Sequence, residues 1–226
     1  MSAIAQVLSP VVNNDYKSKE NQITGLSPQV MTKIYEAQCN LVILQRSLSQ
    51  EVDAYCHELI DSNSYINLRF VIDPKECLSS LSSSLPDLTG KSEFIEDLAL
   101  LVDMYSCLFD LDEVGFRLQV LDRAMCPRFH IDKLGCRLVS TYLGKGTQWL
   151  FNSDVDRSKL GAGNRGLSDD QSGIIADPVC IQNVNQGDVV LLKGEGWYAN
   201  EGLGIVHRSP PMMQGEKRIV VTMDFA

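Results

Sequence analysis

The chain has 226 residues, of which 44% are hydrophobic and 22% are charged, and its formal net charge is -9. These values fit one sizeable globular domain and exclude a disordered or membrane-embedded chain, while the negative charge disfavours nucleic acid and anionic lipid as partners. Seven cysteines without CxxC spacing, no leader-like N-terminus and no membrane-length apolar run together predict a cytoplasmic protein without a disulfide framework.

The first part of the chain is predicted to hold a tail, a strand and a helix. Residues 1–28 show no sustained hydrophobic period, so we expect a flexible tail there. The run "NLVILQR" at residues 40–46 predicts a short buried strand. Ser47 and Gln50 follow it with the spacing of a capping box, which predicts a helix that ends near Ile60.

A second strand and a second helix are predicted before residue 114. The run "INLRFVID" indicates the strand, and the polar "LSSSLPDLTGKS" after it indicates a connection. Phe94, Leu98, Leu101, Tyr105 and Leu108 then recur at spacings of three and four, which is typical of an amphipathic helix. Residues 29–114 are therefore predicted to form a mainly helical region.

From Gly115 onward the pattern changes to short extended runs, among them "FRLQVLD", "CRLVSTYL", "DVVLLK" and "RIVVTMDF". Several short strands at this spacing predict a sandwich or barrel over residues 115–226. The glycine-rich segment 152–186 interrupts them and is too long for a tight turn, so we predict that it is a functional loop, a lid over the site.

Three side chains in this second half have the character of metal ligands. His130 and Asp132 lie two residues apart in "RFHID", and in a strand they would point to the same face. His207 follows at a distance, at the end of another strand-like run. Two histidines and one carboxylate form the facial ligand set of non-haem Fe(II) oxygenases, which leaves coordination positions open.

Arg218 is the candidate anchor for an anionic co-substrate. It follows His207 by eleven residues and begins the run "RIVVTMDF". Its planar guanidinium can bind a carboxylate through two parallel hydrogen bonds, which the ammonium group of the neighbouring Lys217 cannot do.

This order of residues resembles the iron(II)/2-oxoglutarate-dependent dioxygenase superfamily. Its members have an HxD motif, a distant histidine and an arginine about ten residues later, spread over successive strands. The segments "CPRFHID", "RLVSTYLGKGTQWL" and "GDVVLLKGEGW" resemble more closely the bacterial family catalogued as domain of unknown function 1826, and this likeness covers most of the chain. The resemblance implies an α+β fold, in which a double-stranded β-helix (jelly roll) carries the N-terminal helical region on one sheet. It also implies hydroxylation of an unidentified substrate with Fe2+ and 2-oxoglutarate.

Carried over to this sequence, the resemblance makes His130, Asp132 and His207 the iron ligands and Arg218 the partner of the distal carboxylate of 2-oxoglutarate. Many members of the superfamily have Ser or Thr two residues after this arginine, whereas this chain has Val220. A hydroxyl group from another residue would then have to complete the pocket, and Tyr142 and Thr222 are the candidates.

Two other classes of function stay open at this point. Cys126, four residues before His130, would favour Zn2+ if its thiolate joined the ligands, and the protein would then bind metal without oxygenase activity. Alternatively the His/Asp pair is a hydrogen-bonded structural pair in an interaction domain. The structural reading predicts no bound metal, the zinc reading predicts metal without consumption of 2-oxoglutarate, and the oxygenase reading predicts both.

The remaining candidates have plainer interpretations. Arg208 should point away from the site because it is the sequence neighbour of His207, and His57 lies on the first predicted helix. Trp149 and Trp197 are suited either to packing or to stacking on a substrate. The sequence does not identify the substrate, whether small molecule or protein, or the oligomeric state.

Overall fold

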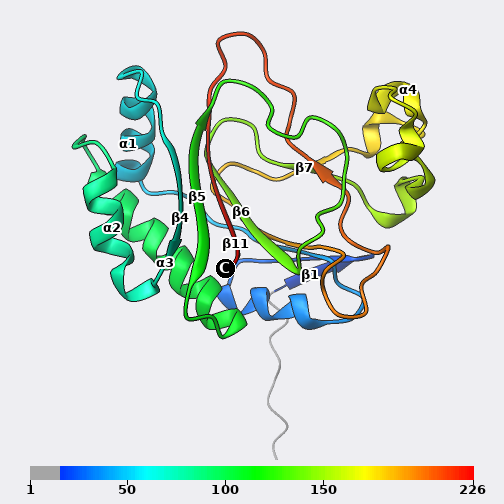
Figure 1. Cartoon of the computed structure of the whole chain (residues 1–226), viewed down its shortest axis with the longest axis horizontal. Helices are drawn as coiled ribbons and strands as arrows, with labels where there is room; N and C mark the ends of the chain where they lie inside the picture. The colour runs from blue at the N-terminus through cyan, green and yellow to red at the C-terminus, as the bar shows by residue number, and fades with distance from the viewer. Residues whose placement is uncertain (1–15) are drawn as a thin grey trace, which may run out of the picture.

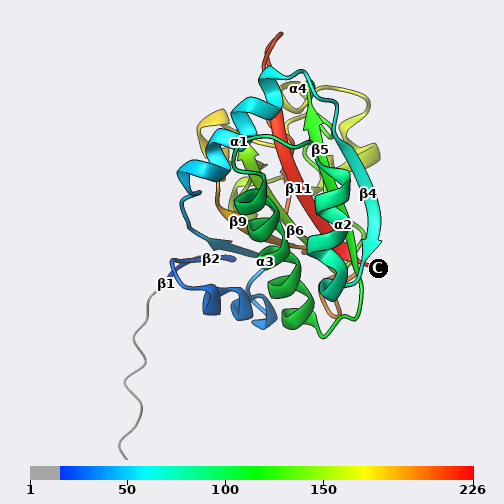
Figure 2. The same ribbon diagram turned by 90° about the vertical axis from the view of Figure 1, so that its left-hand side faces the viewer.

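The computed structural model describes residues 16–226, which form two β-sheets packed on each other and helices on the outer face of the larger sheet (Figures 1 and 2). The larger sheet has the strand order β1-β2-β3-β9-β6-β11-β5-β4. Its strands are β1 (Tyr16–Lys19), β2 (Gln22–Gly25), β3 (Leu41–Leu44), β4 (Asn67–Ile72), β5 (Val114–Leu121), β6 (Cys136–Leu143), β9 (Val189–Lys193) and β11 (Arg218–Phe225). Neighbouring strands are antiparallel except β2 and β3, which are parallel.

The smaller sheet has three short strands in the order β10-β7-β8. They are β7 (Gln148–Trp149), β8 (Gln182–Asn183) and β10 (His207–Arg208). Trp149 of this sheet packs with Val190 and Val220 of the larger one in a common apolar cluster. The space between the two sheets is therefore a hydrophobic layer, and the candidate site lies at its margin.

Three helices cover the other face of the larger sheet, and Figure 2 shows them in front of β5, β6 and β11. The α-helices are α1 (Gln50–Asp61), α2 (Cys77–Ser84), α3 (Lys91–Phe109) and the short α4 (Asp169–Ser172). Short 3-10 helices connect the elements: η1 (Pro28–Tyr35), η2 (Pro74–Glu76), η3 (Asn152–Asp154), η4 (Arg157–Lys159), η5 (Gly161–Asn164) and η6 (Pro178–Cys180). Among the residues described, no helix is long and apolar enough to cross a membrane.

The alternation of side chains along β11 decides which residues can reach the site. Ile219, Val221 and Met223 are fully buried in the core beneath the helices. Because successive residues of a strand point to opposite faces, Arg218, Val220 and Thr222 must point the other way, toward the smaller sheet. This is the face on which a pocket forms.

The structure corrects three expectations about the N-terminal half. The predicted tail of residues 1–28 is too long, because residues 16–25 form β1 and β2, while residues 1–15 lie outside the described part. The N-cap of α1 is Ser49, whose hydroxyl accepts a hydrogen bond from the Val52 N–H at 3.2 Å, and not Ser47. Residues 29–114 are also less separate than predicted, because they supply β3 and β4 to the same sheet.

Candidate metal centre

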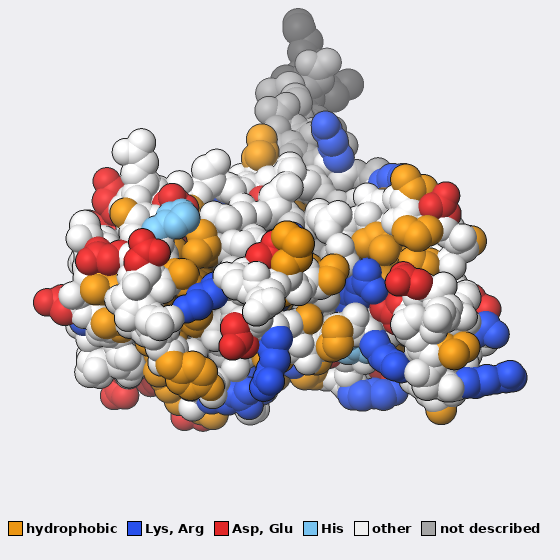
Figure 3. All heavy atoms as spheres, turned by 90° about the horizontal axis from the view of Figure 1, so that it is seen from above, with side chains coloured by type: hydrophobic (Ala, Val, Ile, Leu, Met, Phe, Trp, Pro, Cys, Tyr) orange, Lys and Arg blue, Asp and Glu red, His pale blue; other side chains and the backbone are white. Residues whose placement is uncertain are grey.

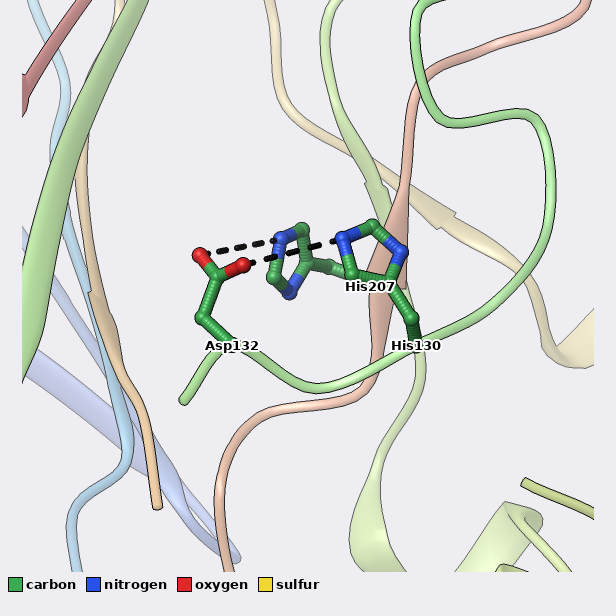
Figure 4. A group of neighbouring side chains, drawn as sticks. All are labelled: His130, Asp132 and His207. Carbon is green, nitrogen blue, oxygen red and sulfur yellow. Dashed lines mark ion pairs between the residues drawn. The ribbon is translucent and has the colours of Figure 1, made fainter. Parts of the chain in front are cut away.

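His130 and His207 are brought together by backbone pairing. The two residues form an isolated antiparallel bridge, in which the N–H of each donates to the carbonyl of the other at 3.0 Å. Their ring centroids are 4.5 Å apart. Asp132 follows on the loop after His130 and points its carboxylate at both rings (Figure 4). The prediction that a regular strand carries His130 and Asp132 is wrong, since His130 forms only a single bridge and Asp132 lies in the irregular segment that follows it.

The three side chains have the arrangement of ligands around one ion. The Nε2 atoms of His130 and His207 are each 3.7 Å from a carboxylate oxygen of Asp132, and the three candidate ligand atoms lie within 4.8 Å of one another. Metal bonds of about 2.1 Å place neighbouring ligand atoms about 3.0 to 3.4 Å apart, so these side chains would have to move slightly inward to share one ion. A distance of 3.7 Å is too long for a hydrogen bond, so no hydrogen bond joins the Asp132 carboxylate to the Nε2 atom of either histidine.

Both imidazoles have the tautomer that a metal ligand requires. Nδ1 of His130 lies 2.9 Å from the carbonyl of Arg128, and Nδ1 of His207 lies 3.1 Å from the carbonyl of Ile205. A carbonyl oxygen only accepts, so Nδ1 carries the proton, and in the neutral ring the Nε2 lone pair faces the carboxylate. Burial lowers the pKa of His207 to about 4, which keeps this ring neutral near pH 7.

One carboxylate oxygen of Asp132 has no hydrogen-bond donor among the described residues. Its Oδ2 atom is buried and accepts no hydrogen bond from any described residue, although Nη1 of Arg137 lies 2.9 Å away in an ion pair without hydrogen-bond geometry. Arg137 itself is held by Asp224, whose Oδ1 accepts from Nε at 2.7 Å. A buried carboxylate oxygen of this kind has the chemistry of a ligand for a divalent cation, which supports a metal at this position.

Arg218 lies in the same pocket as the two histidines, with 3% of its surface exposed. Its Nη2 donates to the hydroxyls of Thr141 at 2.8 Å and Thr147 at 3.2 Å. Its Nε has no partner, and no described carboxylate forms an ion pair with it. Burial lowers the pKa of Arg218 to about 10, because the charged form is desolvated without compensation.

The hydroxyls near Arg218 differ from those predicted. Tyr142 is fully buried on the opposite face of β6, beneath α3, and its hydroxyl donates to Asp97. It therefore cannot contact a ligand of Arg218, and this prediction is wrong. Thr222 does line the pocket. Thr141 and Thr147, which sequence reasoning missed, supply the hydroxyls that the position of Val220 lacks.

The insertion at residues 152–186 supports the histidine segments from outside. Asp169, at the start of α4, is 7% exposed, and its Oδ2 accepts from the N–H of Phe129 at 3.0 Å and from Nη1 of Arg208 at 2.7 Å. These partners are the sequence neighbours of His130 and His207. The guanidinium of Arg208 also lies 4.2 Å from the centroid of the Phe129 ring. Arg208 therefore has the structural contacts that were expected, but it also lines the pocket that contains the two histidines, so the expectation that it points away from the site is wrong. Closure of the insertion over the site stays a prediction.

Replacing Asp169 with alanine is expected to lower the affinity for Fe2+ by up to about 10-fold, the low end of the range for loss of an outer-shell partner, because Asp169 contacts the sequence neighbours of the candidate ligands and not the ligands themselves. The Phe129 N–H and the Arg208 guanidinium lose their common acceptor, and the partly buried Arg208 is left without a counter-ion. Metal affinity by equilibrium dialysis and the melting temperature should both fall. Asp169→Asn, which keeps an acceptor for the Phe129 N–H, should recover part of the affinity.

The adjacent Asp170 provides the control for this experiment, because it is exposed on the same helix. Asp170→Ala should leave both the Fe2+ affinity and the melting temperature unchanged. Equal affinity in Asp169→Ala and Asp170→Ala would show that the insertion does not position the ligands.

The other predicted candidates stand outside the ligand group. Cys126 lines the pocket but is exposed and does not belong to the cluster of possible ligands. Trp149 packs between the sheets, and Trp197 packs on the core of the helical side. His57 lies on α1, 3.6 Å from Asp53. Among the described residues, the candidate ligands are thus two imidazoles and one carboxylate, without a thiolate.

A protein family model described as "Protein of unknown function (DUF1826)" matches residues 25–224 of the chain. No curated protein matches the sequence. Among solved structures, the dioxygenase for auxin oxidation 1 from Arabidopsis thaliana, in its complex with 2-oxoglutarate, is 10% identical with a TM-score of 0.54, and the match covers 92% of each chain. This similarity shows a common fold.

Two further solved structures are less similar. A prolyl-4-hydroxylase from Pseudomonas putida is 15% identical with a TM-score of 0.41, and the match covers 88% of this chain and 97% of that one. HygX from Streptomyces hygroscopicus, solved with iron bound, is 10% identical with a TM-score of 0.44, and the match covers 88% of this chain and 85% of that one.

Proposed function

Since the chain belongs to the DUF1826 family of proteins of unknown function, we propose its activity from the chemistry of the site: it is an Fe2+- and 2-oxoglutarate-dependent oxygenase that hydroxylates a substrate. Its two sheets are the two faces of a double-stranded β-helix, and its metal ligands are His130, Asp132 and His207. The Arabidopsis dioxygenase that has the same fold was solved with 2-oxoglutarate, which supports this choice of co-substrate.

The single observation that carries the proposal is the buried, unpaired charge of Arg218. A cation removed from water is costly unless an anion compensates it. The only hydrogen-bond acceptors of its guanidinium among the described residues are two neutral hydroxyls, and its Nε faces none. It shares a pocket with both histidines, so an anion that reaches Arg218 with one end can reach the metal position with the other. A short dicarboxylate satisfies both requirements.

Each residue then has a defined task. The two histidines and Asp132 hold the metal on one face and leave the opposite positions open. Arg218 binds the distal carboxylate of 2-oxoglutarate, with Thr141 and Thr147 fixing its guanidinium. The apolar side chains of Val139 and Val220 line the same pocket and exclude water from it.

When bound, Fe2+ supplies the redox chemistry, in which O2 and 2-oxoglutarate are converted to succinate and CO2 while one oxygen atom enters a C–H bond of the substrate. The chain itself contributes orientation and shielding, the usual division of labour between a protein and its cofactor.

The zinc alternative is less well supported. The residue that favoured Zn2+ was Cys126, whose thiolate would have joined the ligands, and Cys126 lies outside the cluster of possible ligands. A metal-binding protein without turnover would also have no need for an uncompensated arginine beside its metal. We therefore keep Zn2+ as a competing outcome of the test rather than as a second function.

The test is formation of succinate from 2-oxoglutarate in the presence of Fe2+ and O2, compared in wild type, His130→Ala and Arg218→Ala. Wild type should form succinate and both variants should not. Turnover can be absent without the substrate, so anaerobic binding of Fe2+ and 2-oxoglutarate is measured in the same samples. A wild type that binds Fe2+ without binding 2-oxoglutarate would exclude the oxygenase.

A further inference from the structure

A groove of about 430 Å³ lies beside the metal pocket, where β4 begins and β5 ends. It is lined by Tyr65, Ile66, Asn67, Arg69, Gln119, Val120, Leu121, Asp122, Arg123, Ala124 and Met125. The apolar cluster between the two sheets contains no residue of β4 and only Leu121 of β5 at its margin. This end of the sheet face is therefore open, and the volume is within the range of about 300–1,000 Å³ typical of ligand sites.

The groove adjoins the metal pocket. Met125, which is 44% exposed, lines both the groove and the pocket that contains the histidines. Leu121 of the groove is the cross-strand partner of Arg218 in the pairing of β5 with β11. A molecule in the groove would therefore lie next to the pocket that contains His130.

Two arginines give the groove its charge. Arg69 and Arg123 are exposed and form no ion pair or hydrogen bond through their side chains within residues 16–226. Asp122 is the one acidic residue in the lining, and it too forms no ion pair. In Figure 3, Lys and Arg side chains are spread across the middle and the right of this end of the molecule, and Asp and Glu side chains lie on both sides of it and in the middle. The lining of the groove, with two arginines and one acidic residue, contrasts with the net charge of -9 for the whole chain.

The sheet itself contains a like-charge pair at this place. Arg69 of β4 is directly opposite Arg117 of β5, an arrangement that destabilises a sheet unless another charge compensates it. Asp224 pairs with Arg117 and also with Arg137, so Arg69 is left without a counter-ion. An anion in the groove would supply the missing charge.

We propose that this groove is the substrate subsite, and that the substrate is an anion, a carboxylate or a phosphate ester, with a planar or apolar body. The anionic group lies between Arg69 and Arg123. The body lies against Tyr65, which is 81% exposed at the groove, and against Met125, so that the carbon to be oxidised is directed toward the metal pocket. This inference rests on the proposed function, because it assigns the groove to the reaction at that centre.

The test uses the full chain loaded with Mn2+ and saturating 2-oxoglutarate, with phenyl phosphate and phenylacetate as anionic probes and benzyl alcohol as the neutral probe. Binding is followed by calorimetry, and proximity to the centre by Mn2+-induced broadening of the ring proton signals in NMR spectra. One or both anions should bind with broadened signals, and benzyl alcohol should not bind. The preferred anion then distinguishes a phosphate ester from a carboxylate.

Arg69→Glu and Arg123→Glu should each weaken anion binding at least about tenfold, as expected for loss of a charge-assisted hydrogen bond and reversal of the charge. Lys75→Glu, an equal charge reversal at an exposed position on η2, should change it less than twofold. Arg69 and Arg123 are exposed, and circular dichroism verifies that the variants fold.

Any one of four results would overturn the proposed subsite. These are binding of benzyl alcohol as tight as that of the anions, ring proton signals that are not broadened, absence of anion binding, and unchanged anion affinity in both arginine variants. Failure of the proposed function is a separate result: wild type would then not bind Mn2+ or 2-oxoglutarate. Calorimetry without metal would still show whether the anion binds through Arg69 and Arg123.

Discussion

Replacing His207 with alanine is expected to lower the affinity for Fe2+ by at least about 100-fold, more than the 10- to 100-fold that loss of an outer-shell partner costs. Its Nε2 is one of the three candidate ligand atoms, and the neutral ring is buried with its lone pair facing Asp132. Equilibrium dialysis under anaerobic conditions measures the affinity. Asp132→Asn should give a loss of similar size with almost no change in side-chain volume, which separates loss of a ligand from loss of the fold.

His57→Ala is the matched control, because it removes the same side chain from an exposed position on α1. It should leave Fe2+ affinity unchanged. Similar affinity in His57→Ala, His207→Ala and Asp132→Asn, with all three variants folded, would contradict the metal centre.

Replacing Arg218 with methionine is expected to weaken 2-oxoglutarate binding by about 30-fold or more, since truncation of one partner of a buried charge pair costs at least about 2 kcal/mol. Fe2+ affinity should stay within about threefold of wild type. Without 2-oxoglutarate, the free energy of unfolding should stay the same or rise, because an unpaired buried charge has been removed. Calorimetry and urea denaturation measure the two effects.

Tyr142→Phe is the control for this experiment. It removes a buried hydroxyl from the other face of the same sheet, so it should lower stability through loss of the contact with Asp97 and leave 2-oxoglutarate affinity unchanged. A large loss of stability in Arg218→Met without 2-oxoglutarate, with no effect on binding, would mean that Arg218 is only a structural residue.

Much of the fold could be predicted from local patterns. Leu41–Leu44, Lys91–Phe109 and Arg218–Phe225 are a strand, a helix and a strand where the hydrophobic periods indicate them. These elements are long or fully buried, so their own sequences specify them. The strands of the smaller sheet have two residues each, too few for a period, and long-range pairing creates them.

The sequence was enough to single out the three side chains that the structure brings together, but not the residues around them. His130, Asp132 and His207 stand out because their residue types and order are rare in combination. The partners Thr141 and Thr147 lie 77 and 71 residues before Arg218, and no local pattern marks them. Tyr142 shows the same limit: alternation along β6 gives two sets of residues, and only the packing of α3 decides which set faces the core.

The most direct test is an anaerobic calorimetric titration of 2-oxoglutarate into the full chain, with and without Fe2+. In the proposed function the metal and Arg218 hold opposite ends of one dicarboxylate, so we expect one 2-oxoglutarate per chain, bound tightly only when Fe2+ is present. Binding that is equally tight without metal, or absent when Fe2+ is bound, would contradict the account.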